Sequence, residues 1–114
     1  MIRLTLEDIF EIPGARIYNP DEFKSVSSVS IDSRNIKKNS LFVAIKGEKF
    51  DGHNFIREVI KKGASAIMIN EKKYRIFNDL ELPVITVPDT TIGYGDVART
   101  WRRKLDTKVI GITG

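Results

Sequence analysis

The sequence contains no cysteine and a single histidine, His53, among its 114 residues. The lack of cysteine excludes disulfide bridges, zinc sites built from thiolates and a cysteine nucleophile, and it fits a protein of a reducing compartment. One histidine also excludes a histidine-rich metal centre. We therefore expect no bound metal in this chain.

Long apolar runs are missing as well. No stretch of the chain approaches the roughly 18 apolar residues that a membrane-spanning helix requires. The N-terminal segment reaches two acids, Glu7 and Asp8, too early to hold the apolar core of a signal peptide. The sequence therefore predicts a cytoplasmic protein without a membrane span.

The chain also lacks a strong charge of one sign. It has 19 lysines and arginines against 15 aspartates and glutamates, which gives a net charge of +4. This mild basic bias fits anionic ligands from phosphate esters to nucleic acid and does not choose among them. The length is that of one domain of common size with a single core.

Apolar segments alternate with turn signals in a strand, helix, strand order. This order predicts an α/β fold, a small layered domain with a largely parallel or mixed sheet flanked by helices, whose ligands bind at the carboxyl ends of the strands. Gly63 is expected to end the second helix, and Asp89 or Thr90 to begin the last. Strands are predicted over residues 15–18, 26–32, 41–45, 64–69, 83–88 and 108–112, and helices over residues 6–10, 54–62, 71–79 and 90–105.

A polar triplet follows the strand predicted over residues 26–32. Its hydroxyl and its guanidinium provide a neutral donor and a forked, charged donor, a pair that suits a phosphate oxygen. The alternative is a turn capped by the aspartate and the serine with an exposed arginine, and composition alone favours that alternative. The triplet consists of Asp32, Ser33 and Arg34.

A charged loop with two glycines, residues 46–53, separates the strand over 41–45 from the helix over 54–62. Its glycines permit a close approach of the backbone to a ligand, and Phe50 offers a flat face to a base. Lys49 or His53 could contact phosphate. A helix-capping or solvent-exposed role for His53 stays open beside that interpretation.

Two other classes of function are open at this point. A hydrolase could use Ser33, His53 and an aspartate, but no Gly-x-Ser-x-Gly turn surrounds any serine. A nucleic-acid-binding module would depend on net charge and on the basic residues 99–104, without interleaved exposed aromatics. Residues 111–114, Gly-Ile-Thr-Gly, follow a predicted strand as the start of a phosphate loop does, but the lysine of such a loop is missing.

In their order and spacing, these segments resemble the N-terminal domain of the Mur ligases, ATP-dependent amide-forming enzymes of peptidoglycan synthesis. The resemblance covers residues 26–114 and depends on the triplet, the strand and loop over 40–47, the Phe-Asp-Gly-His run that begins at Phe50, and the Gly-Ala pair at Gly63. Residues 109–114 look like the entry to the family's ATP loop. The helix segment before them resembles the family branch that adds D-alanyl-D-alanine more than the branch that adds the third residue of the stem peptide.

The resemblance implies that residues 1–108 form a UDP-N-acetylmuramoyl-peptide-binding N-terminal domain. It implies that residues 109–114 are the first strand and the truncated start of an ATP-binding central domain. Ser33 and Arg34 would lie near the diphosphate and residues 46–50 near uracil and ribose. Residues 51–53 would shape the loop and cap the helix. The implied UDP-binding residues are Ser33, Arg34, Lys46, Gly47, Glu48, Lys49, Phe50, Asp51 and His53, and the implied start of the ATP loop is Thr113 and Gly114.

The reaction implied by the resemblance joins D-alanyl-D-alanine to UDP-N-acetylmuramoyl-tripeptide through an acyl phosphate formed from ATP, with Mg²⁺ neutralising the phosphates. None of this catalytic equipment lies in the chain, so we expect no catalytic residue, no bound cofactor and no ligation by the chain alone. ATP and Mg²⁺ belong to the full-length enzyme. The same domain of the third-residue ligase stays open as an alternative, and a nucleic-acid-binding module as a weaker one.

Overall fold

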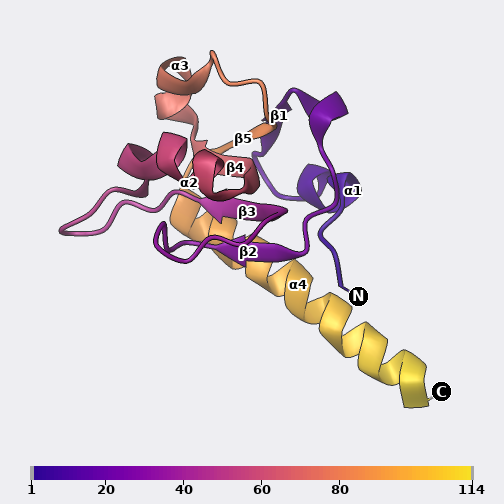
Figure 1. The fold of residues 1–114 in the computed structure, drawn as a ribbon. Coiled ribbons are helices and arrows are strands. Elements are labelled where there is room, and N and C mark those ends of the chain that lie inside the picture. The colour runs from indigo at the N-terminus through magenta and orange to yellow at the C-terminus, as the bar shows by residue number, and fades with distance from the viewer. Residues whose placement is uncertain (1, 114) are drawn as a thin grey trace.

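The computed structural model describes the backbone of residues 2–113 and the side-chain surroundings of residues 2–106. Five strands form one sheet in the order β1-β5-β4-β3-β2, parallel from β2 to β5, with β1 antiparallel to β5. Helices lie on both sides of this sheet (Figure 1), so the predicted α/β fold is confirmed. The strands are β1 (Arg16–Tyr18), β2 (Ser28–Ser30), β3 (Ser40–Val43), β4 (Ala64–Asn70) and β5 (Val84–Val87), the helices are α1 (Leu6–Phe10), α2 (Ile56–Lys62), α3 (Tyr74–Phe77) and α4 (Thr90–Thr113), and the 3₁₀ turns are η1 (Pro20–Glu22), η2 (Gly52–Phe55) and η3 (Glu71–Lys73).

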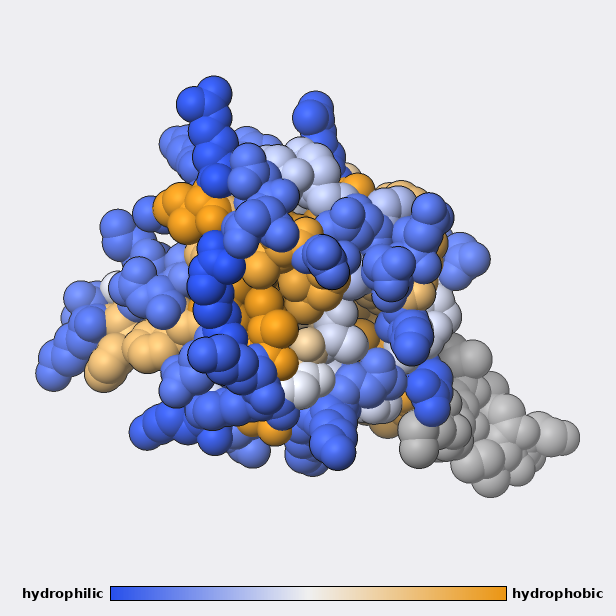
Figure 2. Space-filling view, turned by 45° about the horizontal axis from the view of Figure 1, so that its top comes forward, coloured by the Kyte–Doolittle hydropathy of each residue, from blue (hydrophilic) through white to orange (hydrophobic). Residues whose placement is uncertain are grey.

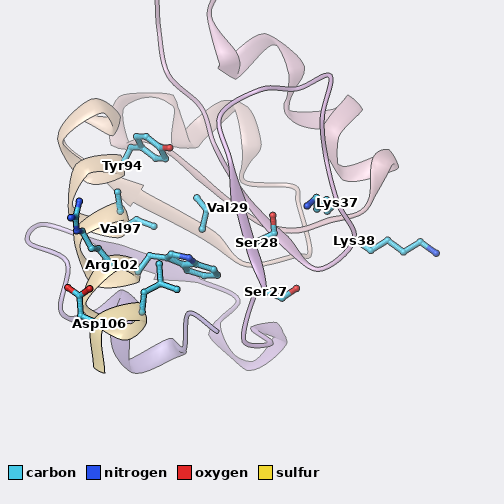
Figure 3. A pocket seen from close by; sticks show the side chains of 12 residues that line it. Ser27, Ser28, Val29, Lys37, Lys38, Tyr94, Val97, Arg102 and Asp106 are labelled. Atoms are coloured by element: carbon cyan, nitrogen blue, oxygen red, sulfur yellow. The ribbon is translucent and has the colours of Figure 1, made fainter. Parts of the chain in front are cut away.

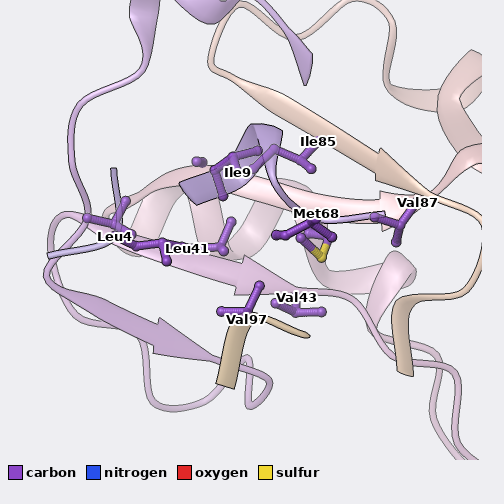
Figure 4. Close-up of a cluster of buried hydrophobic side chains, with 11 residues drawn as sticks. Leu4, Ile9, Leu41, Val43, Met68, Ile85, Val87 and Val97 are labelled. Atoms are coloured by element: carbon purple, nitrogen blue, oxygen red, sulfur yellow. The ribbon is translucent and has the colours of Figure 1, made fainter. Parts of the chain in front are cut away.

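The central strands are buried on both faces of the sheet. Along β3, Leu41 packs in the core beneath α1 and α4, while the next residue, Phe42, packs in the core beneath α2 and α3. Side chains alternate between the faces of a strand, and here both faces are covered, so the strand reads as one unbroken apolar run. Figure 4 shows the first core, where Ile9 of α1 and Val97 of α4 approach the sheet.

Several predicted elements are shorter or more broken in the structure. The strand predicted over 41–45 ends at Val43, and the helix predicted over 54–62 is divided between η2 and α2. β2 covers only Ser28–Ser30, because Val26 exchanges backbone hydrogen bonds of 2.9 and 3.0 Å with Leu4 and so leaves the sheet. The helix predicted over 71–79 is divided between η3 and α3.

Hydrophilic side chains cover much of the face shown in Figure 2, with apolar areas between them.

Helix α4 begins where the sequence predicts. The Asp89 carboxylate accepts hydrogen bonds from the N–H groups of Thr91 (2.8 Å) and Ile92 (3.3 Å), which caps the first turn. Gly93 in that turn lies close to the sheet, since a Cβ atom there would meet the Val87 side chain at 3.0 Å. This glycine lowers helix propensity and at the same time allows α4 to pack tightly on β5.

The C-terminal end of α4 differs from the sequence prediction. We expected the helix to end near residue 105 and a strand to follow over residues 108–112, but α4 continues to Thr113 (Figure 1). A strand needs a neighbouring strand to bond its backbone, and no strand of the described sheet pairs with this segment, whereas a helix bonds its own backbone. The strand prediction is therefore wrong in this structure.

The side chains of residues 107–114 lie outside the described residues, and with them the implied ATP-loop residues Thr113 and Gly114. The assignment of residues 109–114 to a second domain stays a prediction. Among the helices that the structure describes, none is both long enough and apolar enough to cross a membrane.

A reciprocal cap holds the start of α1. The Thr5 N–H donates to Asp8 Oδ2 at 2.7 Å, and the Asp8 N–H donates to Thr5 Oγ1 at 3.3 Å. Lys104 of α4 approaches the same carboxylate at 2.9 Å. Partial burial disfavours the ionised carboxylate, but the hydrogen bonds from Thr5 and Lys104, together with the Lys104 charge, outweigh it and hold the pKa of Asp8 below its ordinary 3.8.

We expect Asp8→Asn to lower the free energy of unfolding by about 1 kcal/mol near pH 6, since the cap and the ion pair with Lys104 both weaken. A carboxyl whose pKa is lowered by folding stabilises the folded state above its unfolded pKa, and this contribution is lost as the pH falls through the folded pKa. The difference between variant and wild type should therefore shrink as the pH falls below 3.8. Urea unfolding at pH 6 and pH 3 measures it, and an equal difference at both would contradict the assignment.

Candidate functional site

A cleft of about 480 Å³ opens at the carboxyl ends of β2 and β3. These strands are parallel neighbours, so the segments that follow them meet at one edge of the sheet, as expected for a ligand site in an α/β fold. The structure thereby brings the triplet at 32–34 into the same cleft as Phe50. The lining consists of Ile31, Asp32, Ser33, Arg34, Phe42, Ile45, Phe50, Gly52 and Phe55.

The triplet forms a turn stabilised by its aspartate. Asp32 accepts hydrogen bonds from the Arg34 backbone N–H at 2.9 Å and from the guanidinium Nε and Nη2 at 3.1 and 3.2 Å. The side-chain hydrogen bonds, followed by the backbone one, lower the pKa of Asp32. The Arg34 side chain is 88% exposed. The capping aspartate and the exposed arginine of the alternative that composition favoured are therefore confirmed, and the arginine lies at the cleft. The serine that caps this turn is Ser30, whose Oγ accepts from the Asp32 N–H at 3.1 Å, and not Ser33.

Lys62 is a second cation beside the cleft, which the sequence analysis missed. Its Nζ donates to the backbone oxygen of Ser33 at 2.8 Å and lies 3.8 Å from the Glu58 carboxylate. In the sequence, Lys62 stands in the last turn of the helix predicted over 54–62. A lysine there is explained by its favourable interaction with the helix dipole, so it did not indicate a ligand site. Positive charge at this rim therefore comes from Lys62 as well as Arg34.

The apolar part of the lining was also missed, except for Phe50. Phe42 and Ile45 belong to the buried run of β3 and the residues after it, and Phe55 ends η2. In the sequence these residues read as core, because a side chain that packs in a core and also forms the floor of a cleft has the same pattern as any other core residue. Ile31, 46% exposed, adds an apolar group at the rim.

The loop that carries Phe50 folds as a tight hairpin. Lys46 and Asp51 form an antiparallel bridge, and the Gly52 N–H donates to the oxygen of Ile45 at 2.9 Å. Phe50 is 71% exposed and lines the cleft. An exposed ring at a cleft offers a flat face for stacking or packing of a base.

His53 is enclosed and both of its ring nitrogens are bonded within the protein. Its side chain is 6% exposed, Nδ1 lies 2.6 Å from Asp51 Oδ1, and Nε2 accepts from the Asn70 N–H at 3.0 Å. These partners assign the proton to Nδ1, which donates to Asp51. Partial burial disfavours the ionised Asp51 carboxylate, but the hydrogen bonds from the backbone and the ring of His53 outweigh it and lower the pKa of Asp51. A direct contact of His53 with phosphate does not fit this arrangement, whereas a role in shaping the loop does.

The other predicted binding residues lie outside the first cleft. A second cleft, of about 330 Å³, opens next to the hairpin. Its lining includes Lys46, Asp51 and His53. Three further residues, Gly47, Glu48 and Lys49, are exposed in the hairpin and line neither cleft. Of the nine residues that the family resemblance implied, the first cleft therefore gathers Ser33, Arg34 and Phe50.

The hydrolase alternative requires a serine within reach of a histidine base. Ser33 lines the first cleft, whereas His53 lies at the second, with its ring enclosed in the protein. Moreover, Nε2 of His53 accepts a backbone hydrogen bond and has no free position for a serine proton. The geometry therefore gives no support to a nucleophilic triad of these residues.

A wider groove, of about 720 Å³, runs between β2 and α4 (Figure 3). Its lining includes Val29 of β2, Tyr94 and Val97 of α4, and the basic residues Lys37 and Lys38. None of the binding residues predicted from the sequence lies in this lining. The groove is larger than the first cleft. It is not the candidate site, because it contains none of the predicted binding residues.

Comparison with known proteins identifies the family of the chain. Residues 25–99 match the family model described as Mur ligase family, catalytic domain, a span that contains both clefts. The chain belongs to the Mur ligase family.

Relatives of two specificities are similar to this chain. It is 32% identical to the UDP-N-acetylmuramoyl-tripeptide–D-alanyl-D-alanine ligase of Haemophilus influenzae over 100% of this chain and 24% of that protein. It is 41% identical to the UDP-N-acetylmuramoyl-L-alanyl-D-glutamate–2,6-diaminopimelate ligase of Aquifex aeolicus over 80% of this chain and 18% of that protein. The solved structure of MurF from Acinetobacter baumannii matches with a TM-score of 0.69 and 25% identity, over 83% of this chain and 20% of that one. The chain spans about a quarter of the length of the curated relatives that match all of it.

Proposed function

We propose that this chain is the UDP-N-acetylmuramoyl-peptide-binding part of a ligase that adds D-alanyl-D-alanine to UDP-N-acetylmuramoyl-tripeptide. The uridine diphosphate end of that substrate binds in the first cleft. One observation carries the proposal: Ser33, Arg34 and Phe50, from two separate segments, line a single cleft at the carboxyl ends of parallel strands. Relatives with this activity match the whole chain, which supports the choice of substrate.

The chemistry of the cleft suits both ends of a uridine diphosphate. Phe50 and Phe55 supply aromatic faces against which uracil packs, and the volume of about 480 Å³ lies in the range of small-molecule sites. At the rim, the guanidinium of Arg34 and the ammonium of Lys62 attract the diphosphate, and the Ser33 hydroxyl adds a neutral donor. Arg34 is exposed, so water solvates its guanidinium when no phosphate is bound. The empty site therefore contains no unpaired buried charge at this position.

The binding of ATP and D-alanyl-D-alanine and the formation of the amide bond belong to other parts of a longer ligase, located in the cytoplasm. Among the residues that the structure describes, no group of three or more His, Asp or Glu side chains fits a metal ion. We assign ATP, Mg²⁺ and D-alanyl-D-alanine to the rest of the ligase, and the implied ATP-loop start, Thr113 and Gly114, lies outside the described residues. We expect the chain alone to bind the nucleotide and to form no amide bond.

The same domain of a third-residue ligase is the second candidate, favoured by the 41% identity to the Aquifex aeolicus protein. The two candidates share the uridine diphosphate site and differ in the peptide that follows it. Titration with UDP-N-acetylmuramoyl-tripeptide and with the corresponding dipeptide distinguishes them. Tighter binding of the dipeptide would favour the second candidate.

The test of the site is calorimetric titration of UDP into the chain. We expect Arg34→Ala to weaken binding by about tenfold or more, the effect of losing a hydrogen bond to a charged group. Arg75→Ala is the matched control, because it removes the same charge from an exposed position on α3, and it should leave the dissociation constant unchanged. Equal losses in both variants would show a response to net charge alone. Binding of a random oligonucleotide in place of UDP would support the nucleic-acid alternative.

A further inference from the structure

The side chain of Phe50 makes few packing contacts that would hold it in place. Its ring is 71% exposed, so few side-chain contacts of its own hold it against the cleft. Its place depends on the backbone of the hairpin, which is tied to the end of β3 by the Gly52 N–H bond to Ile45 at 2.9 Å. That bond joins the hairpin to the end of β3 and not to β4.

The ring of His53 provides the second tie. It connects Asp51, the residue after Phe50, to the Asn70 N–H at the end of β4, with contacts of 2.6 and 3.0 Å. Asn70 is itself held, because its side chain donates to the oxygen of Pro88 at 3.3 Å and accepts from the N–H of Lys72 at 3.0 Å. The hairpin is thus anchored to a central strand of the sheet.

We propose that His53 is a positioning residue, which sets Phe50 as a wall of the first cleft without touching the ligand. This inference rests on the proposed function, since it assigns a role within the uridine site. The burial of the ring and the use of both nitrogens inside the protein leave His53 no contact with a bound nucleotide. Its effect on binding therefore passes through the hairpin and Phe50.

His53→Asn is the sharpest variant, since an asparagine amide reaches the position of Nδ1 and not that of Nε2. It keeps a donor for Asp51 and loses the acceptor for the Asn70 N–H. We expect it to weaken UDP binding by about tenfold, because binding must then also order the hairpin. His53→Gln retains an acceptor near Nε2 and should recover part of this loss.

A double-mutant cycle with Phe50→Ala tests the route of the effect. If His53 acts through Phe50, His53→Asn has no further effect on UDP binding in the Phe50→Ala background. The same loss in both backgrounds would overturn the proposal, because it would show a separate contact with the ligand. Unchanged binding for His53→Asn in the wild-type background would overturn it as well.

A structural loss must be separated from a loss of positioning. Ile9→Val destabilises the core beneath α1, away from both clefts, and should leave UDP binding unchanged. Amide hydrogen exchange of the 114-residue chain gives a readout that needs no ligand: His53→Asn should speed exchange at Gly52 and Asn70, and Ile9→Val should not. If the wild-type chain binds no UDP, the proposed function fails, and unchanged exchange at Gly52 would independently overturn the tie.

Discussion

Phe42→Ala is expected to lower the free energy of unfolding by about 3 to 5 kcal/mol. Phe42 is fully buried in β3, in the core that β3 and β4 share with α2 and α3. Its removal exposes a cavity that neighbours such as Ile56 and Val59 fill only in part, because the sheet backbone prevents them from collapsing into it. Since Phe42 lies directly beneath the first cleft, its removal lets the floor of the cleft relax, and the variant should bind UDP more weakly.

Urea denaturation of Phe42→Ala measures this loss, with Phe10→Ala as its matched control. Phe10 is 61% exposed on α1, so the same change of side chain there should alter the free energy of unfolding by less than about 0.5 kcal/mol. Similar losses in the two variants would contradict the description of β3 as a strand buried on both faces.

Gly52→Ala is expected to weaken UDP binding by about tenfold or more and to destabilise the chain by about 1 to 3 kcal/mol. A Cβ atom at Gly52 would lie 2.9 Å from the Ile45 nitrogen and 3.0 Å from the Ala44 Cα. Both are backbone atoms that cannot rotate away, so the hairpin must move off the end of β3. That movement displaces Phe50 from the cleft.

Gly95→Ala provides the matched control for Gly52→Ala. A Cβ atom at Gly95 meets nothing within 4 Å, and the residue lies inside α4. Alanine has the higher helix propensity, so this variant should gain up to about 1 kcal/mol of stability and bind UDP as the wild type does. Thermal unfolding and calorimetric titration of both variants measure the contrast, and unaltered UDP binding by Gly52→Ala would contradict the close approach of the hairpin to β3.

The candidate site was predictable only in part. The triplet and Phe50 were found because polar residues and a lone aromatic after buried strands stand out in a sequence. Lys62 and Phe42 were missed. The helix dipole is enough to explain a lysine at the end of α2, and burial in the core is enough to explain a phenylalanine in β3. Only the packing of α2 against the turn at Ser33 gives Lys62 its place at the cleft.

Features that depend on neighbours along the chain could be predicted from the order of the residues. These include the buried β3 strand, the Gly63 end of α2 with its positive φ of 120°, the Asp89 cap of α4 and the turn held by Asp32. Each follows from the pattern of side chains or from a hydrogen bond that spans a few residues. Sequence order also carried the family resemblance, which the match over residues 25–99 confirms.

Features that depend on partners distant in sequence came from the tertiary structure. It separated the residues of the predicted binding loop, because Phe50 lines the cleft at the ends of β2 and β3, whereas Lys46, Asp51 and His53 line the second cleft. It bonded His53 to Asn70, a partner 17 positions away, and so gave a residue expected near phosphate a place inside the protein. It also extended α4 through the predicted final strand, since a strand forms only where another strand accepts its hydrogen bonds, and that partner is not a property of the segment itself.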